Sequence, residues 1–120
     1  MKIKRIPMNK RMSTATIHNG VVYLAGCCAD TTVLDIEAQA KETCANIEKA
    51  LESAGSDKRH MLSVVVYLVD IEYFAGFNAV YDDWVDQDHL PVRTAIVVAD
   101  LVVPGTLCEV TVTASVIEMT

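Results

Sequence analysis

The sequence lacks the features expected of a membrane-spanning, secreted or nucleic-acid-binding chain. No apolar run approaches the about 20 residues that a membrane-spanning helix needs, although hydrophobic residues make up 52% of the chain. The basic residues Lys2, Lys4 and Arg5 are followed by no apolar core, so we expect no signal peptide. The chain has 10 lysines and arginines against 16 aspartates and glutamates, a net charge of −6 that disfavours a phosphate backbone as partner.

The cysteines lack the spacing of a metal site. Cys27 and Cys28 are adjacent, Cys44 falls in a helical pattern, and Cys108 falls in a strand pattern. No Cys-x-x-Cys pair occurs, and no histidine stands at ligand spacing from a cysteine pair. We therefore expect free thiols in a reducing cytoplasm and no bound metal.

The chain has no internal repeat, low-complexity segment or linker, so residues 1–120 are expected to form one domain. A domain of this size buries roughly two-thirds of its unfolded surface. The high apolar content suggests that part of the surface is also buried between subunits.

The first part of the chain is typical of an edge strand followed by a hairpin. Lys2 to Ile6 alternates polar and apolar residues, and a proline ends the pattern. The runs Ser13–His18 and Val21–Ala25 flank Asn19-Gly20, the strongest short signal for a hairpin turn.

Two helices are predicted by periodicity and capping residues. The first runs from about Leu34 to Ala54, with Thr32 or Asp35 as its cap and a glycine after its end. The second runs from about Ile71 to Val85. Its aromatic row is more typical of core packing than of a cofactor site. Asn78 and Tyr81 on the same helix are candidates for a role where subunits meet, although helix packing also accounts for them adequately.

Three further strands complete the pattern. Met61–Val69 is almost continuously apolar, which is typical of a central strand buried on both faces. Leu90–Val98 has the composition of a buried strand with one arginine inside it. In Leu107–Ile117, one face is apolar and the other carries Glu109 and three hydroxyl residues.

The order β-β-β-α-β-α-β-β predicts an α+β sandwich in which both helices cover one face of a mixed sheet. The other face would stay apolar and uncovered in a monomer, and a symmetric oligomer would cover it.

Arg93 is the only charged residue between His89 and Asp100. A guanidinium cannot be deprotonated and is rarely buried without an anionic partner. The partner is either Glu109, in an ion pair that fixes strand register, or the carboxylate of a ligand. An ion pair of this kind is a structural alternative to a functional role.

The connection after the Arg93 strand constrains this choice. Residues Val103-Pro104-Gly105-Thr106 are typical of a type II turn. A tight hairpin there would place Glu109 opposite Asp100, about seven residues and about 23 Å from Arg93. The two charges could share a pocket only across a longer connection, about residues 99–106, or from different subunits. Both arrangements stay open at this point.

Several segments, taken in order, resemble the Rid/YjgF family of reactive-intermediate deaminases, and the resemblance covers nearly the whole chain. These segments are Met12-Ser13-x-Ala15, Val22-Tyr23-Leu24-Ala25-Gly26, Phe77-Asn78-Ala79-Val80-Tyr81, Leu90-Pro91-Val92-Arg93 and Pro104-Gly105-Thr106-Leu107-Cys108-Glu109-Val110. The resemblance implies a chorismate-mutase-like fold and a homotrimer with a central barrel. It also implies ligand pockets at the subunit interfaces and hydrolysis of enamines and imines, such as 2-aminoacrylate, to 2-oxo acids and ammonia.

The resemblance also assigns roles to individual residues. Arg93 matches the family arginine that binds the substrate carboxylate, Glu109 the glutamate that helps to place the attacking water, and Gly26 the glycine whose backbone lines the pocket. We add Ser13 and Thr94 as hydrogen-bond donors near such a pocket. An imine already reacts with water, so holding the substrate and aligning one water would suffice without metal or organic cofactor.

Three expected pocket positions differ from members with demonstrated imine hydrolysis. Met12 stands where these members often have tyrosine, Cys27 where they often have glutamine, and Ala95 where they often have cysteine. These differences favour an alternative function, a non-catalytic trimer that binds small carboxylates. A third possibility is RNA cleavage, attributed to some relatives, against which the net charge and the absence of a basic stripe weigh.

Overall fold

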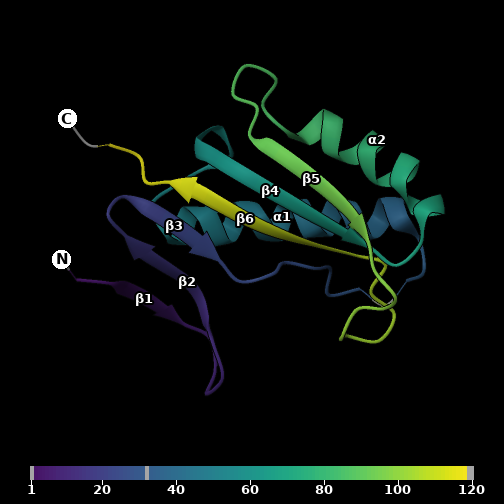
Figure 1. Ribbon diagram of the computed structural model, residues 1–120, viewed down its shortest axis with the longest axis horizontal. Coiled ribbons are helices and arrows are strands. Elements are labelled where there is room, and N and C mark those ends of the chain that lie inside the picture. The colour runs from purple at the N-terminus through teal and green to yellow at the C-terminus, as the bar shows by residue number, and fades with distance from the viewer. Residues whose placement is uncertain (1, 32, 119–120) are drawn as a thin grey trace.

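The computed structural model describes residues 2–31 and 33–118. Two α-helices lie on one face of a mixed six-stranded sheet with the order β1-β2-β3-β6-β4-β5 (Figure 1). The strands are β1 (Lys4–Pro7), β2 (Ser13–His18), β3 (Val21–Leu24), β4 (Met61–Leu68), β5 (Val92–Val97) and β6 (Cys108–Ser115), and the helices are α1 (Ile36–Ser53) and α2 (Phe74–Trp84). The predicted fold class and element order are confirmed. Neither helix within the described ranges is long and apolar enough to cross a membrane.

The hairpin between β2 and β3 forms at the predicted turn. Asn19 and Gly20 have φ angles of 52° and 78°, the left-handed conformation that a two-residue turn of this kind requires. His18 pairs with Val21 directly across the turn. The register of the first strands therefore follows from a local sequence signal.

One aspartate caps α1, and a second caps the 3₁₀ turn that precedes α2. The Asp35 side chain accepts a hydrogen bond from the Glu37 amide at 3.1 Å, while the alternative cap, Thr32, lies outside the described residues. Asp70 caps a single 3₁₀ turn, Ile71–Tyr73, that leads into α2. The second helix is therefore α-helical from Phe74, three residues later than the periodicity indicates.

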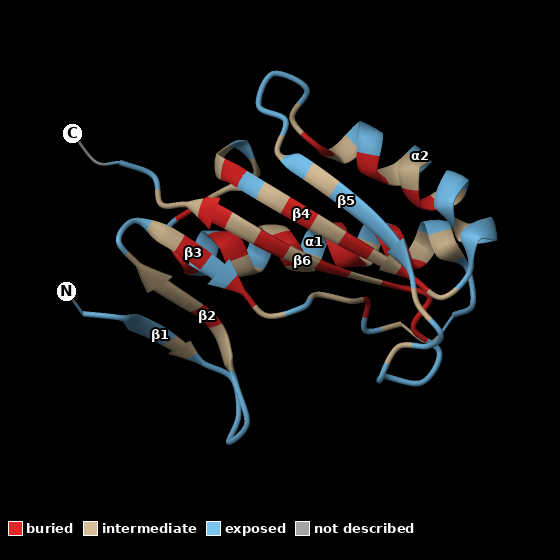
Figure 2. Cartoon of the chain, in the orientation of Figure 1, coloured by how far each residue is buried: buried red, intermediate tan, exposed pale blue. Residues whose placement is uncertain are grey.

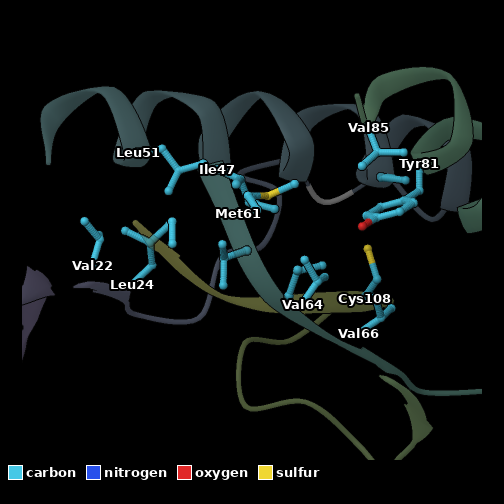
Figure 3. Packing of buried hydrophobic residues seen from close by; sticks show 14 of the residues in the cluster. Val22, Leu24, Ile47, Leu51, Met61, Val64, Val66, Tyr81, Val85 and Cys108 are labelled. Atoms are coloured by element: carbon cyan, nitrogen blue, oxygen red, sulfur yellow. The ribbon is translucent and has the colours of Figure 1, made fainter. Parts of the chain in front are cut away.

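The core lies between the helices and the covered face of the sheet (Figure 3). As predicted, β6 alternates between a fully buried apolar face and a half-buried face with Glu109 at its start. Burial of β4 on both faces is a wrong prediction for the single chain, because its other residues, which do not face the helices, are half-buried or, at Leu62, exposed. The residues that β4 buries toward the helices are Met61, Val64, Val66 and Leu68.

Strand β5 differs most from the sequence-based expectation. The predicted turn forms, with a hydrogen bond of 3.2 Å from the Thr106 amide to the Val103 carbonyl, but it does not make β5 and β6 neighbours. Instead β5 runs parallel to β4 at the edge of the sheet, because α2 carries the chain from the end of β4 back to its start. The expected burial is also wrong for a single chain, since Val92 and Ile96 are 71% and 42% exposed. Figure 2 shows that most of β5 is exposed.

Candidate functional site

Arg93 lies on the helix side of β5, where α2 packs against it. Its Cα pairs with that of Val64, a residue buried toward the helices. The Arg93 Nη2 atom donates a hydrogen bond of 2.6 Å to Asn78 Oδ1. The guanidinium carbon lies 4.7 Å from the centroid of the Tyr81 ring, within the range of a cation–π interaction. These contacts hold the guanidinium in one orientation.

Two further aromatic rings of α2 surround the same group. The centroids of Phe74 and Phe77 lie 5.8 Å and 5.9 Å from the guanidinium carbon of Arg93. The aromatic row is therefore in part core, as predicted, since Phe77 is fully buried. It is also the platform for the arginine. Among the described residues, no carboxylate forms an ion pair with Arg93.

Of the alternatives left open for Arg93, the ion pair with Glu109 does not form within one chain. Glu109 pairs with Tyr67 on β4, and Tyr67 pairs with Ile96 on β5, three residues from Arg93. The Cα atoms of Arg93 and Glu109 are thus two strand spacings apart across the sheet and three residues apart along the strand direction, a separation of about 14 Å. The side chains also lie on opposite faces, because Glu109 belongs to the open face of the sheet. Alternation along the strands thus excludes contact.

Gly26 lies against Glu109 as a result of a bulge in β3 and its extension. Tyr23 pairs with Thr113, and Cys27 pairs with Val110, so four steps on one strand match three on the other (27 − 23 = 4; 113 − 110 = 3). A Cβ atom on Gly26 would lie 2.6 Å from Glu109 Oε2. The absence of a side chain at Gly26 therefore allows the Glu109 carboxylate to lie against the backbone.

The thiols beside this position are held in the protonated form. Burial raises the pKa of Cys27 to about 11, and neighbouring Cys28 and Glu109 add to the effect. The pKa of Cys28 is also raised, first by burial and then by Glu109. The backbone amide and carbonyl of Cys27 each bond to Val110 at 2.8 Å. Cys27 therefore bridges to β6 through its backbone and carries a neutral thiol.

The remaining predicted site residues divide between two places. Ser13 begins β2 on the side of Gly26, since the Ala25 amide bonds to the Thr14 carbonyl at 2.9 Å, and Met12 precedes it with 46% of its surface exposed. Thr94 and Ala95 lie on β5 beside Arg93, both exposed. In one chain the predicted residues thus form two separate groups, which we call half-sites of the candidate site. The arginine half-site comprises Arg93, Thr94 and Ala95, and the glutamate half-site comprises Met12, Ser13, Gly26, Cys27 and Glu109.

Asn78 and Tyr81 are functional candidates that helix packing alone did not single out. They contact Arg93 because α2 connects two parallel strands and lies over the second of them. The sequence contained a usable signal: a strand, a helix and another strand in succession predict a parallel pair with the helix packed on it. That pattern would have placed this helix face over Arg93.

Two surface hollows of the described chain lie apart from both half-sites. The larger surface hollow, about 400 Å³, lies between α1 and α2 and is lined by residues of those helices: Glu37, Lys41, Cys44, Ala79, Val80, Asp83 and Trp84. A second hollow of about 250 Å³ lies near the end of α1. Neither is lined by a predicted site residue. Over residues 2–31 and 33–118, no group of three or more His, Cys, Asp or Glu side chains is arranged to hold a metal ion.

Comparison with known proteins supports the resemblance seen in the sequence. The family model described as Endoribonuclease L-PSP matches residues 2–116. The RutC family protein YoaB of Escherichia coli is 36% identical over 116 residues, covering 97% of this chain and all of that protein. A RutC family protein of Haemophilus influenzae is 34% identical over 116 residues, covering 96% of this chain and 99% of that protein.

A solved structure agrees closely with the fold. The crystal structure of a YjgF family member from Neisseria meningitidis matches with a TM-score of 0.94 and 30% identity, covering 99% of this chain and 98% of that one. The sequence match and the fold match both extend over nearly the whole chain. The chain therefore belongs to the Endoribonuclease L-PSP family, the family of the RutC and Rid/YjgF proteins.

Proposed function

We propose that this protein is a homotrimeric hydrolase that converts enamines and imines derived from amino acids into 2-oxo acids and ammonia. The observation that carries the proposal is the state of Arg93. Its guanidinium is oriented by Asn78 and the Tyr81 ring, and no carboxylate of the described chain pairs with it. An oriented guanidinium with free N–H groups suits bidentate binding of a ligand carboxylate.

Glu109 supplies the second chemical group. Its carboxylate lies beside the backbone at Gly26, where it would accept a hydrogen bond from a water molecule and direct the water oxygen at the imine carbon. The water oxygen bonds to that carbon, both water protons pass to the nitrogen, and the C–N bond breaks, so that ammonia leaves and the carbon becomes a carbonyl. An enamine would first take one proton at carbon and release one from nitrogen to become the imine.

The homotrimer explains how the two half-sites serve one ligand. Within one chain they lie on opposite faces of the sheet, at about 14 Å between the Cα atoms of Arg93 and Glu109. A symmetric assembly would bring the edge strand β5 of one subunit beside the glutamate half-site of its neighbour. The exposed apolar residues of β5, Val92 and Ile96, are suited to such an interface.

Ammonia release from imines generated by an amino-acid oxidase tests the reaction. We expect the wild-type protein to accelerate release above the buffer rate. Arg93→Ala should remove the acceleration, because the substrate carboxylate loses its partner. Arg59→Ala, at an exposed arginine outside both half-sites, is the matched control and should behave as wild type. No acceleration by the wild-type protein, across small, bulky and acidic side chains, would refute the deaminase proposal.

A second candidate function is binding of small carboxylates without catalysis. It is favoured by Cys27, whose high pKa leaves a neutral thiol next to Glu109, and by Met12 and Ala95, which bring no reactive group. Calorimetry with pyruvate separates the two functions. Binding that depends on Arg93, without ammonia release from any imine, would establish the binding protein instead.

The cytoplasm remains the proposed location. Within the described ranges the four cysteines are free thiols, which a reducing compartment maintains.

A further inference from the structure

Gln39 of α1 is a buried polar residue for which the proposed reaction has no direct use. Its side chain is fully buried, with 0% exposure. The Nε2 atom donates to the Val33 carbonyl at 2.9 Å and to the Gly105 carbonyl at 2.8 Å, and the Oε1 atom accepts from the Leu107 amide at 2.8 Å. Both amide hydrogens and the amide oxygen are therefore used.

These bonds join two segments that are far apart in the sequence. Val33 belongs to the first segment, the described residues 27–31 and 33–35 that lead from β3 to α1. Gly105 lies in the turn before β6, and Leu107 directly follows that turn. The first segment is also held by two other residues of α1. Glu42 Oε1 accepts from the Asp30 and Thr31 amides at 2.6 Å and 3.0 Å, and Asn46 Nδ2 donates to the Cys28 carbonyl at 2.9 Å.

The three residues form a polar row on α1. Gln39, Glu42 and Asn46 are three and four residues apart, so they share one side of the helix. Glu42 and Asn46 form hydrogen bonds with the first segment only, whereas Gln39 forms hydrogen bonds with both segments. The first segment begins next to Gly26, and Leu107 is two residues before Glu109. Gln39 therefore contacts the backbone of the segment that follows Gly26 and of the segment that precedes Glu109.

We propose that Gln39 is a positioning residue that sets the placement of Glu109 relative to the backbone at Gly26. The proposal rests on the proposed function of that half-site. Gln39 touches neither residue and acts through Val33, Gly105 and Leu107. A shift of about 1 Å in a group that aligns an attacking water is enough to cost up to about a hundredfold in rate.

Replacing the amide of Gln39 by a carboxyl group tests whether Gln39 positions Glu109 or has a purely structural role. After Gln39→Glu, an ionised carboxylate would have no hydrogen to donate and would face the carbonyl oxygens of Val33 and Gly105. Burial and these oxygens raise the pKa of the introduced carboxyl. Below that pKa the neutral carboxyl can donate one hydrogen bond and accept another, so the native arrangement is partly restored as the pH falls.

The experiment compares kcat for ammonia release by Gln39→Glu with the wild-type value at each pH from about 6 to about 9, since the introduced carboxyl is expected to titrate in this range. We expect kcat to be lower by about tenfold or more at the upper end and to approach the wild-type value at the lower end. The affinity for pyruvate, which reports on Arg93, should change little. Gln87→Glu is the matched control, because Gln87 is exposed at the end of α2, and its kcat ratio should stay constant.

A constant kcat ratio for Gln39→Glu across this range would overturn the proposal, and so would a parallel loss of pyruvate affinity. A second measurement keeps the test independent of the proposed reaction. If the wild-type protein releases no ammonia, hydrogen exchange at the backbone amides of Gly26 and Glu109 decides. The exchange rate of each amide in Gln39→Glu is divided by the wild-type rate at the same pH. A ratio that falls as the pH falls supports Gln39 as the positioning residue, and a ratio that does not change with pH refutes the proposal.

Discussion

Arg93 takes its properties from the residues around it. An arginine in a strand was expected to need a carboxylate, and Glu109 was the obvious one in the sequence. The structure instead supplies the Asn78 amide oxygen and the face of Tyr81. Both orient the guanidinium without neutralising it, which leaves the charge available to a ligand. The candidate residues were named from the sequence, but their separation into two places depends on strand pairing, which local patterns do not specify.

Substitution of Asn78 tests this orientation. Asn78→Ala removes the bond of 2.6 Å to Arg93. A hydrogen bond to a charged group is worth about 1.5–3 kcal/mol, so the Kd for pyruvate should rise by about tenfold or more. Asn78→Asp should weaken binding further, because its carboxylate would compete with the ligand. Calorimetry measures both values, and Asn78→Asp binding as tightly as wild type would contradict this account of Arg93.

Gly26→Ala tests the contact between backbone and carboxylate. The new Cβ would lie 2.6 Å from Glu109 Oε2, the end of a flexible side chain that can turn away. The free energy of unfolding should therefore change by less than about 1 kcal/mol, whereas kcat for ammonia release should fall by about tenfold or more as the carboxylate moves. Denaturant unfolding and steady-state kinetics separate the two effects. Normal kcat in a stable variant would show that Glu109 does not act from this position.

Elements defined by local signals were predicted closely. The Asn19-Gly20 turn, the Asp35 cap and the alternation along β6 each depend on contacts within a few residues, and all agree with the structure. The position of β5 depends on pairing with a strand about 30 residues earlier. The unbroken apolar run of β5 indicated burial, which one chain does not provide. The crossover through α2 was the signal that could have placed this strand.

The open face of the sheet dominates the molecule as a whole. It is formed by the half-buried residues of β4 and β6 and the exposed residues of β5, and no other layer of the described chain covers it (Figure 2). Ile96→Lys should convert the proposed trimer to a folded monomer, because a buried ammonium at the interface would have no partner. Val102→Lys, at a loop residue that is 97% exposed, is the control and should leave the trimer intact. Analytical ultracentrifugation measures the outcome, and an intact trimer in Ile96→Lys would place the interface elsewhere.

Charge is also distributed unevenly over the whole molecule. The first eleven residues contain five of the 10 basic residues and no acidic one, so the rest of the chain carries 5 − 16 = −11. Two of these basic residues, Lys4 and Arg5, are exposed on the edge strand β1. The five residues are Lys2, Lys4, Arg5, Lys10 and Arg11. Any RNA cleavage should be compared between wild type and Arg93→Ala, since cleavage that survives the substitution indicates a contaminant.

Complementation between two inactive variants tests the central claim, that the two half-sites come from different subunits. Arg93→Ala and Glu109→Gln should each lack activity alone. In trimers assembled at random from equal amounts, a pocket built from two subunits has both groups intact in about one case in four, because each group is intact in half of the subunits. Co-assembly should therefore restore about a quarter of the wild-type rate of ammonia release. If Arg93 and Glu109 served the same ligand from one chain, no mixed trimer would contain an intact pocket, and the absence of any recovery in verified mixed trimers would contradict the account.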